Sequence, residues 1–145
     1  MKSVAFHLAL PVHDLVEARR FYGEILGCAE GRSAPRWVDF DFFGHQLSLH
    51  LSPLAEPGHS ATPVDGDHVP VPHFGAVLSW SDWGLLCERL AALQLPSVIG
   101  PRVRFAGLAG EQGTVFVRDP SGHMLEFKGF KDPDAVFQVD DERER

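Results

Sequence analysis

Cysteine is scarce in this sequence, where only Cys28 and Cys87 occur among 145 residues. Each lies in an apolar neighbourhood, and their spacing matches no zinc-binding motif. The pattern therefore argues against a cysteine-based zinc site. We expect both side chains to be buried free thiols in a reducing compartment.

Long hydrophobic runs are also missing. No apolar stretch reaches the ~20 residues that a helix needs to cross a bilayer. The N-terminal stretch "MKSVAFHLALPVHD" has too short an apolar part for a signal peptide and lacks a cleavage-like site. We therefore expect a soluble, cytoplasmic protein that has no membrane partner.

Positive charge is in short supply and is not clustered. The chain carries 13 Lys and Arg against 20 Asp and Glu, a formal net charge of −7, so nucleic acid and anionic membranes are poor candidate partners. No Gly-rich phosphate loop follows a strand, which argues against a nucleotide or flavin. Hydrophobic residues make up 44% of the chain, enough for the core of one compact domain of 145 residues.

The most informative feature present is an internal repeat. The stretches "GHQLSLHL" (Gly44–Leu51) and "GHMLEFKG" (Gly122–Gly129) both open with Gly-His, place Leu fourth, and then alternate between two faces. The same order of elements precedes each copy, which indicates a duplicated module. The sequence divides into module one (4–52), a linker (53–70) rich in Pro, Gly, Ser, His and Asp, module two (71–130) and a charged tail (131–145).

Each module is expected to contain a strand, a helix and further strands. The first helix spans 13–27, with Asp14 as its cap and Gly27 at its end, and the second spans 81–95 with Ser81 or Asp82 as its cap. Neither module could bury its sheet face alone. We therefore predict an α+β fold in which two βαβββ modules form one curved, mixed, mostly antiparallel sheet of about eight strands, with the helices outside.

Three residues on equivalent elements of the repeat could bind a metal ion. His7 lies in the first strand of module one, His73 begins the equivalent strand of module two, and Glu126 stands between Leu125 and Phe127 in the last strand. A carboxylate at such a half-buried position needs a partner. Two imidazoles and one carboxylate form a ligand set that leaves positions open on a divalent metal; it suits Fe(II), and also Zn(II), Ni(II), Mn(II) or Co(II).

The sequence resembles the vicinal oxygen chelate superfamily, which is also called the glyoxalase/bleomycin resistance protein/dioxygenase superfamily. The resemblance covers about residues 4–130 and rests on "FHLALPVHDLVEARRFYGEILG", "HFGAVL" and "TVFVRDPSGHMLEFKGF". It implies paired βαβββ modules, a divalent metal, and a substrate that chelates the metal through neighbouring oxygens. The family's ligand positions carry over onto His7, His73 and Glu126, in agreement with the interpretation from the residues themselves.

The resemblance also identifies departures from the family's best-known reactions. Glyoxalase I enzymes have a second glutamate in the last strand of the first module, and Ser48 stands there in this chain. His50 lies two residues after Ser48 and should face the same side. It could act there as an acid/base, bind the substrate through a hydrogen bond, or be a structural histidine. In the ending that is typical of extradiol dioxygenases, a tyrosine stands where this chain has Phe116, and a histidine is expected upstream of it. This chain lacks that histidine, and Gln112 is the polar residue nearest to its place. We select His50 and Gln112 as candidate catalytic residues; Tyr22 is expected to pack on the helix instead.

Other polar residues are weaker candidates. The strand "WVDFDF" places Trp37, Asp39 and Asp41 on the cavity side, where Trp37 could stack on a planar substrate, and we favour a solvated position for both aspartates. Arginines that could hold a phosphonate are expected to be solvated, and the remaining histidines are expected on the surface or in turns. The arginines are Arg102, Arg104 and Arg118, and the histidines are His13, His45, His59, His68 and His123.

The sequence predicts a metal-dependent enzyme that acts on a small oxygenated organic molecule and forms a homodimer. An extradiol-like dioxygenase with Fe(II) is the leading hypothesis, because the ligand set leaves room for both substrate and dioxygen. A glyoxalase-type isomerase or lyase is the second. A non-catalytic drug-binding protein, like the bleomycin resistance proteins, remains the alternative from another class.

Overall fold

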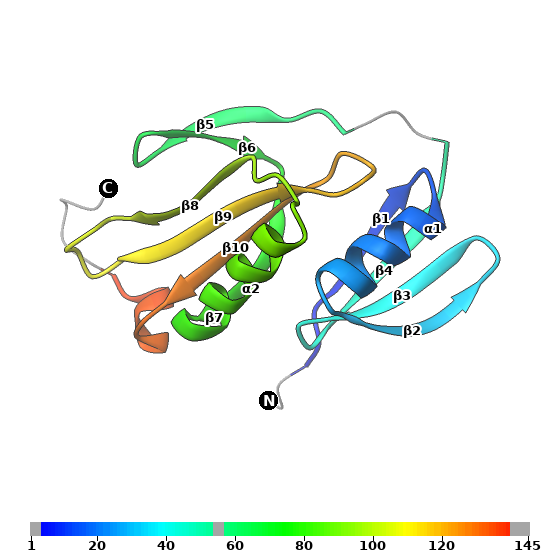
Figure 1. The fold of residues 1–145 in the computed structure, drawn as a ribbon, viewed down its shortest axis with the longest axis horizontal. Coiled ribbons are helices and arrows are strands. Elements are labelled where there is room, and N and C mark those ends of the chain that lie inside the picture. The colour runs from blue at the N-terminus through cyan, green and yellow to red at the C-terminus, as the bar shows by residue number, and fades with distance from the viewer. Residues whose placement is uncertain (1–3, 54–56, 140–145) are drawn as a thin grey trace. The chain divides into compact units, whose positions relative to one another are not determined.

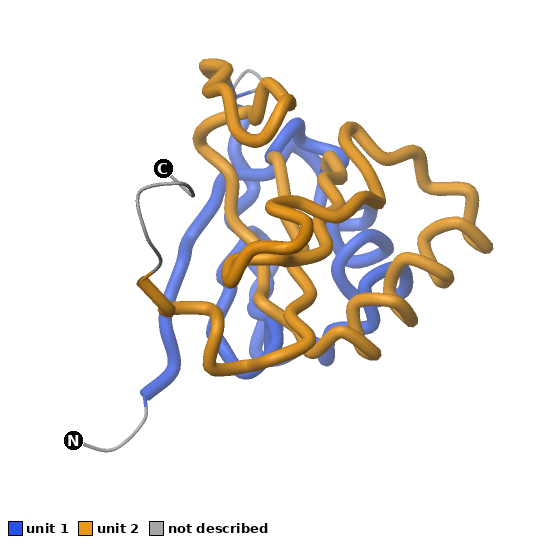
Figure 2. The backbone as a smooth tube through the Cα atoms, turned by 90° about the vertical axis from the view of Figure 1, so that its left-hand side faces the viewer, with its two compact units in different colours: residues 1–57, 119–123 blue, residues 58–118, 124–145 orange. Residues whose placement is uncertain are grey.

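The computed structural model describes residues 4–53 and 57–139, and these form two compact units. The first unit comprises Met1–Pro57 with Asp119–His123, and the second comprises Gly58–Arg118 with Met124–Arg145 (Figure 2). The chain therefore leaves the second unit for five residues and returns to it. Among the described residues, no helix is long and apolar enough to cross a membrane.

The first unit is a four-stranded sheet covered by one helical segment (Figure 1). Its strands have the order β1-β4-β3-β2, with β1 parallel to β4 and the other neighbours antiparallel. The strands are β1 (His7–Val12), β2 (Ala29–Ala34), β3 (Trp37–Phe42) and β4 (His45–Leu51), and the helical segment is α1 (Leu15–Arg19) followed by the π-helical η1 (Arg20–Ile25).

The predicted ends of this helical segment are confirmed. The Asp14 side chain accepts a hydrogen bond from the Glu17 backbone N–H, so Asp14 caps α1. Gly27 has a φ of 77°, the left-handed conformation that lets the chain leave a helix. The alternation of "WVDFDF" also holds, because Val38, Phe40 and Phe42 are buried in the core.

Tyr22 fixes the turn Asp119–His123 to the first unit. Its ring is fully buried between Phe21 and Phe40, and its hydroxyl donates a 2.8 Å hydrogen bond to Asp119 Oδ2. Burial and the Asp119 carboxylate hold the pKa of Tyr22 well above its ordinary value, so the phenol stays a donor. The prediction that Tyr22 packs within the helix face is consistent with this position.

We expect Tyr22→Phe to lower the free energy of unfolding by about 1.5–3 kcal/mol, because a buried carboxylate oxygen loses its donor. Urea denaturation measures the change. The double variant Tyr22→Phe with Asp119→Asn should lose less free energy of unfolding than the sum of the losses in the two single variants, because both substitutions affect the same hydrogen bond. A loss below about 0.5 kcal/mol for Tyr22→Phe would contradict this role, since that is the usual range for surface changes.

The second unit repeats the architecture of the first. Its sheet has the order β7-β10-β9-β8, with β7 parallel to β10 and the other neighbours antiparallel. The strands are β7 (Phe74–Ser79), β8 (Ile99–Arg104), β9 (Gln112–Arg118) and β10 (Met124–Phe130), followed by the 3-10 helix η2 (Pro133–Phe137). The helix α2 (Trp80–Ala92) covers one face of this sheet (Figure 1).

Two details of α2 show how it is placed. Its cap is Ser79, whose hydroxyl accepts from the Asp82 backbone N–H, so the prediction of Ser81 or Asp82 was wrong by two or three residues. Trp83 packs against Gly113 and Gly129, where a Cβ would lie 2.6–2.8 Å from the Trp83 side chain. These two glycines therefore admit the indole, which donates to the Phe127 carbonyl.

The stretch interpreted as a linker contains a β-hairpin. Strands β5 (Ser60–Val64) and β6 (Asp67–Val71) pair antiparallel, and Asp65-Gly66 forms the turn with φ values of 41° and 85°. Asp-Gly is a typical hairpin sequence because both turn residues need positive φ. Pro63 and Pro70 obscured the strands, since proline inside a strand pattern argues against it.

The predicted class, α+β with two βαβββ-like modules, is confirmed, with one correction to its assembly. The described strands form two separate four-stranded sheets and the hairpin, not one sheet of eight strands. Each four-stranded sheet is mixed and mostly antiparallel, as expected. In each module the first strand pairs in parallel with the last, so the first strand lies at one edge of its sheet.

Both cysteines are free, and each is only partly buried. Burial raises the pKa of Cys28 to about 11, with Asp41 acting in the same direction, and burial also raises that of Cys87. The expectation of free thiols is confirmed, and their raised pKa values make them poor nucleophiles at neutral pH.

Candidate functional site

Polar side chains of three strands share the face of the second sheet opposite α2. Directly opposed residues of antiparallel strands have side chains on the same face. The register pairs Lys128 with Thr114, Thr114 with Arg102, and Gln112 with Arg104. Glu126, two residues before Lys128, shares this face, while Gly113 and Gly129 of the other parity contact Trp83 of α2.

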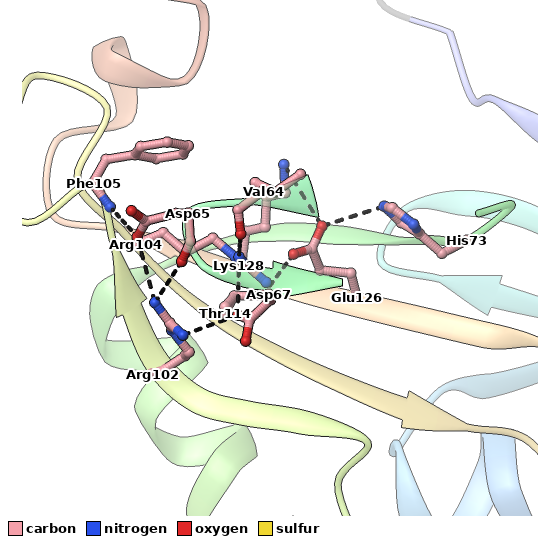
Figure 3. A network of polar contacts seen from close by, with 10 residues as sticks. All are labelled: Val64, Asp65, Asp67, His73, Arg102, Arg104, Phe105, Thr114, Glu126 and Lys128. Atoms are coloured by element: carbon pink, nitrogen blue, oxygen red, sulfur yellow. Dashed lines mark hydrogen bonds and ion pairs between the residues drawn. The ribbon is translucent and has the colours of Figure 1, made fainter. Parts of the chain in front are cut away.

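His73 and Glu126 meet on this face (Figure 3). His73 Nε2 lies 3.4 Å from Glu126 Oε1, and the His73 ring stands edge-on to Phe116 at 5.0 Å between centroids. Glu126 is only 7% exposed, so its carboxylate is largely removed from water. The structure thus brings together two of the three predicted metal ligands.

A second set of contacts orients both groups. His73 Nδ1 lies 2.6 Å from the Pro70 carbonyl oxygen, so Nδ1–H donates there and Nε2 is the ring nitrogen that faces Glu126. The Thr114 hydroxyl donates to Glu126 Oε2 at 2.6 Å, which leaves Oε1 directed at His73. Metal-binding imidazoles and carboxylates are typically held by such outer partners. Thr114 is fully buried and was not identified from the sequence.

The spacing of the pair fits a shared metal ion. Two ligand atoms that each lie about 2.1 Å from a metal, at a tetrahedral angle, are about 3.4 Å apart. A charged hydrogen bond would be nearer 2.7–2.9 Å. The 3.4 Å between His73 Nε2 and Glu126 Oε1 is compatible with a shared metal ion and also with a long hydrogen bond between the two groups. Imidazole and carboxylate are also ligands that first-row divalent metals accept.

The electrostatics of the pair favour a charged carboxylate. Burial by itself would raise the pKa of Glu126, but hydrogen bonds from His73 and Thr114, with the nearby Lys128, hold it below its usual value. The hydrogen bond to Glu126 raises the pKa of His73, against the opposing effect of burial. Glu126 is therefore an anion at neutral pH, as a metal ligand must be.

The third predicted ligand, His7, is an exposed residue of β1 in the first unit, where it pairs in register with Gln46. Within the described residues, no group of three or more His, Cys, Asp or Glu is arranged to hold a metal ion. The part of the candidate centre that one unit supplies is therefore the His73–Glu126 pair, and His7 stays a prediction.

Position 48 in the first unit is part of a buried hydrogen-bonded group. The Ser48 hydroxyl donates to Asp39 Oδ1 at 2.6 Å, and Gln46 Nε2 donates to Asp39 Oδ2 at 3.1 Å. Asp39 is 7% exposed, so the prediction that it is solvated was wrong, whereas Asp41 is exposed as expected. Asp39 and Asp41 line a shallow hollow of about 300 Å³.

The two candidate catalytic residues lie in different units. His50 is an exposed residue of β4, paired in register with Trp37 and Pro11, and so shares the face of Ser48 and Asp39. Gln112 is buried at the start of β9, and its Nε2 donates to the Gly110 carbonyl. By strand alternation His50 shares the face of Ser48 in the first sheet and Gln112 shares that of Thr114 in the second, and the catalytic role of both stays a prediction.

Two expectations about surface residues are corrected. Arg104 is 2% exposed and is bound to the β5–β6 hairpin through Val64 and Asp67, so it is not solvated. His123 is buried and lies 2.6 Å from the Pro11 carbonyl oxygen. Both side chains bridge segments distant in sequence, and nothing in the local pattern signals such contacts.

A family model matches residues 5–127 of the chain, and its description is Glyoxalase/Bleomycin resistance protein/Dioxygenase superfamily. The chain belongs to this superfamily. Its members are mostly metalloenzymes that often bind a divalent metal. The match spans both units, including His7, His73 and Glu126.

Solved structures of the superfamily share the fold. A glyoxalase/bleomycin resistance protein/dioxygenase from Alicyclobacillus acidocaldarius is 35% identical, with 92% of this chain and 96% of that chain covered and a TM-score of 0.78. The fosfomycin resistance protein FosX from Listeria monocytogenes is 19% identical, with 93% and 98% covered and a TM-score of 0.67. A lactoylglutathione lyase from Agrobacterium tumefaciens is 21% identical, with 90% and 96% covered and a TM-score of 0.62. No curated protein matches the chain.

Proposed function

We propose that this superfamily member is a divalent-metal-dependent enzyme that acts on a small oxygenated organic molecule. His7, His73 and Glu126 would hold the metal. The observation that carries the proposal is the His73–Glu126 pair, because the Pro70 carbonyl and the Thr114 hydroxyl each direct one ligand atom toward the other residue. The predominance of metalloenzymes in the superfamily supports it.

The reaction that this set suits best is an Fe(II)-dependent, extradiol-like oxygenation. A bound Fe(II) would supply Lewis acidity toward substrate oxygens and a position for dioxygen. Thr114 fixes the orientation of the Glu126 carboxylate, and Phe116 limits rotation of the His73 ring. His50 and Gln112 are the candidates for moving a proton and for binding the substrate. We expect the protein to act as a homodimer.

A glyoxalase-type isomerase or lyase is the second candidate, and one observation favours it. Ser48 cannot act as a base, but its hydroxyl binds Asp39, a buried carboxylate on the same strand face. A carboxylate at that place could perform the proton transfer that such reactions need. If the protein bound neither iron nor another metal, a ligand-binding function without catalysis would remain.

Metal content measured by mass spectrometry tests the proposal. Untagged protein is purified without chelator and under nitrogen, beside His73→Ala and the control His59→Ala. We expect near-stoichiometric metal in the wild type and control and little or no metal in His73→Ala, because a ligand is removed.

The identity of the metal separates the two reactions. Iron, lost in His73→Ala, supports the oxygenase and is followed by oxygen uptake with catechol-like substrates. Zinc, nickel or manganese, lost in the same variant, supports the isomerase or lyase. Wild-type protein that binds none of these ions after reconstitution would refute the metalloenzyme proposal.

A further inference from the structure

The β5–β6 hairpin is held against β8 by two arginines of that strand (Figure 3). Arg104 Nη1 donates a 2.8 Å hydrogen bond to the Val64 carbonyl oxygen and lies 3.0 Å from Asp67 Oδ2. Arg102 Nη1 lies 3.2 Å from the same carboxylate oxygen, and Arg102 Nη2 donates to the Asp65 carbonyl oxygen at 2.9 Å. We call Arg102 and Arg104 the hairpin clamp.

Arg104 is the buried member of the hairpin clamp. Its side chain is 3% exposed, whereas that of Arg102 is 38% exposed. A buried guanidinium is costly unless a carboxylate balances its charge. Both polar contacts described for Arg104 come from the hairpin, through Val64 and Asp67. Detaching the hairpin would take the carboxylate away from this buried charge, so Arg104 favours the docked position of the hairpin.

The strand that the hairpin clamp holds ends beside the candidate metal centre. β6 begins at Asp67, and the carbonyl of Pro70, three residues later, accepts from His73 Nδ1–H at 2.6 Å. Val69 between them is buried, and β6 pairs with β5 along its whole length. A displacement at Asp67 is therefore carried along a paired strand to Pro70. The position of the hairpin thus sets the position of the acceptor that holds the His73 ring.

The second ligand of the candidate centre is oriented from the same part of the sheet. The Thr114 hydroxyl donates to Glu126 Oε2, and Thr114 pairs in register with Arg102 of β8. β8 therefore lies beside the residue that orients Glu126, and it also holds the hairpin that orients His73. The contacts that direct the two ligands toward each other share β8 as a common base.

We propose that Arg104 is a positioning residue for the candidate metal centre: by docking β6 it holds the Pro70 carbonyl where it fixes the His73 ring. The inference rests on the proposed metal-dependent function and adds the segment that prepares one of its ligands. An imidazole that is already oriented loses less rotational freedom when a metal binds, so the affinity for the metal is higher.

Two NMR signals of metal-free, ¹⁵N-labelled protein test the proposal. One is the His73 Nδ1–H, which its hydrogen bond to Pro70 protects from exchange, and the other is the Trp83 indole N–H, which donates to the Phe127 carbonyl. In Arg104→Met we expect the His73 signal to broaden or disappear and the Trp83 signal to stay in place, because the hairpin loosens while the sheet and α2 are retained. A role in overall stability alone would change both signals.

Zinc affinity, measured by competition with a chromophoric chelator, gives the effect on the candidate centre. We expect Arg104→Met to bind zinc about tenfold more weakly, which is typical when an outer partner of a metal ligand is lost. Arg104→Lys should bind zinc within about threefold of the wild type, because a single nitrogen makes the contacts to both Val64 and Asp67. The control Arg118→Met removes an exposed arginine of β9 and should change the affinity less than about twofold.

The outcomes separate this inference from the proposed function. An unchanged His73 Nδ1–H signal in folded Arg104→Met overturns the inference, and so does a zinc affinity equal to that of Arg118→Met. If Arg104→Met does not fold, Arg102→Met removes the more exposed arginine of the hairpin clamp, and an unchanged His73 signal in that variant overturns the inference. Wild-type protein that binds no divalent metal refutes the proposed function instead, and the two NMR signals still decide whether the hairpin clamp positions His73.

Discussion

Glu126→Gln should lower the affinity for a divalent metal at least about a hundredfold while the fold survives. Glutamine has nearly the same shape, and its amide oxygen can still accept the Thr114 hydroxyl, so the packing of β10 is retained. What is lost is the negative charge at Oε1, the atom that lies 3.4 Å from His73 Nε2. Competition with a chromophoric chelator measures the affinity, and thermal unfolding checks the fold.

The control for this substitution is Glu111→Gln, which makes the same change of charge in the same unit. Glu111 pairs with Lys131 at 3.8 Å and accepts from the Gly107 backbone N–H, away from the candidate centre. Its metal affinity should equal that of the wild type. If Glu126→Gln bound metal as tightly as Glu111→Gln, Glu126 would not be a ligand.

Gly75→Ala should destabilise the second unit by about 3–4 kcal/mol, near the upper end for single substitutions. Gly75 pairs with Glu126 in the parallel register of β7 and β10. A Cβ at Gly75 would collide with the Glu126 backbone oxygen and would stand 2.6 Å from its carbonyl carbon, so β7 has to move away from β10. Urea denaturation measures the loss, and metal affinity should fall with it because the strand of Glu126 is displaced.

Gly84→Ala is the matched control for this prediction. Gly84 lies inside α2, where nothing would meet a Cβ within 4 Å. Alanine should therefore stabilise the helix by about 0.5–1 kcal/mol, since glycine is a poor helix former. A Gly75→Ala variant as stable as Gly84→Ala would contradict the β7–β10 register.

Local patterns in the sequence predict most elements of the fold. Alternation identified "WVDFDF" and both Gly-His strands, and Asp14 and Gly27 marked the ends of the first helical segment. The repeat gave the two modules. Strand pairing was harder, because alternation reveals which face a residue occupies but not which strand lies beside it. The parallel pairing within each module and the separate sheets therefore had to come from the structure.

In the candidate site, too, the sequence predicted the residues whose type and place in the repeat were informative, but not those whose role depends on strand pairing. His73 and Glu126 could be selected because their types and their equivalent places in the repeat suggested a metal. Thr114 could not, because its role depends on the register that sets β9 beside β10. The burial of Arg104 depends on the hairpin, which the sequence marks only by Asp65-Gly66 between two proline-containing strands.

The turn Asp119–His123 has a consequence for a chain that is cut between its two modules. This turn joins two strands of the second unit but belongs to the first, where Tyr22 and Pro11 bind Asp119 and His123. A chain broken between Pro53 and Gly58 would give two fragments, and the N-terminal one would lack these partners. These contacts could then form only when the two fragments associate, because Tyr22 and Pro11 lie on one fragment and Asp119 and His123 on the other.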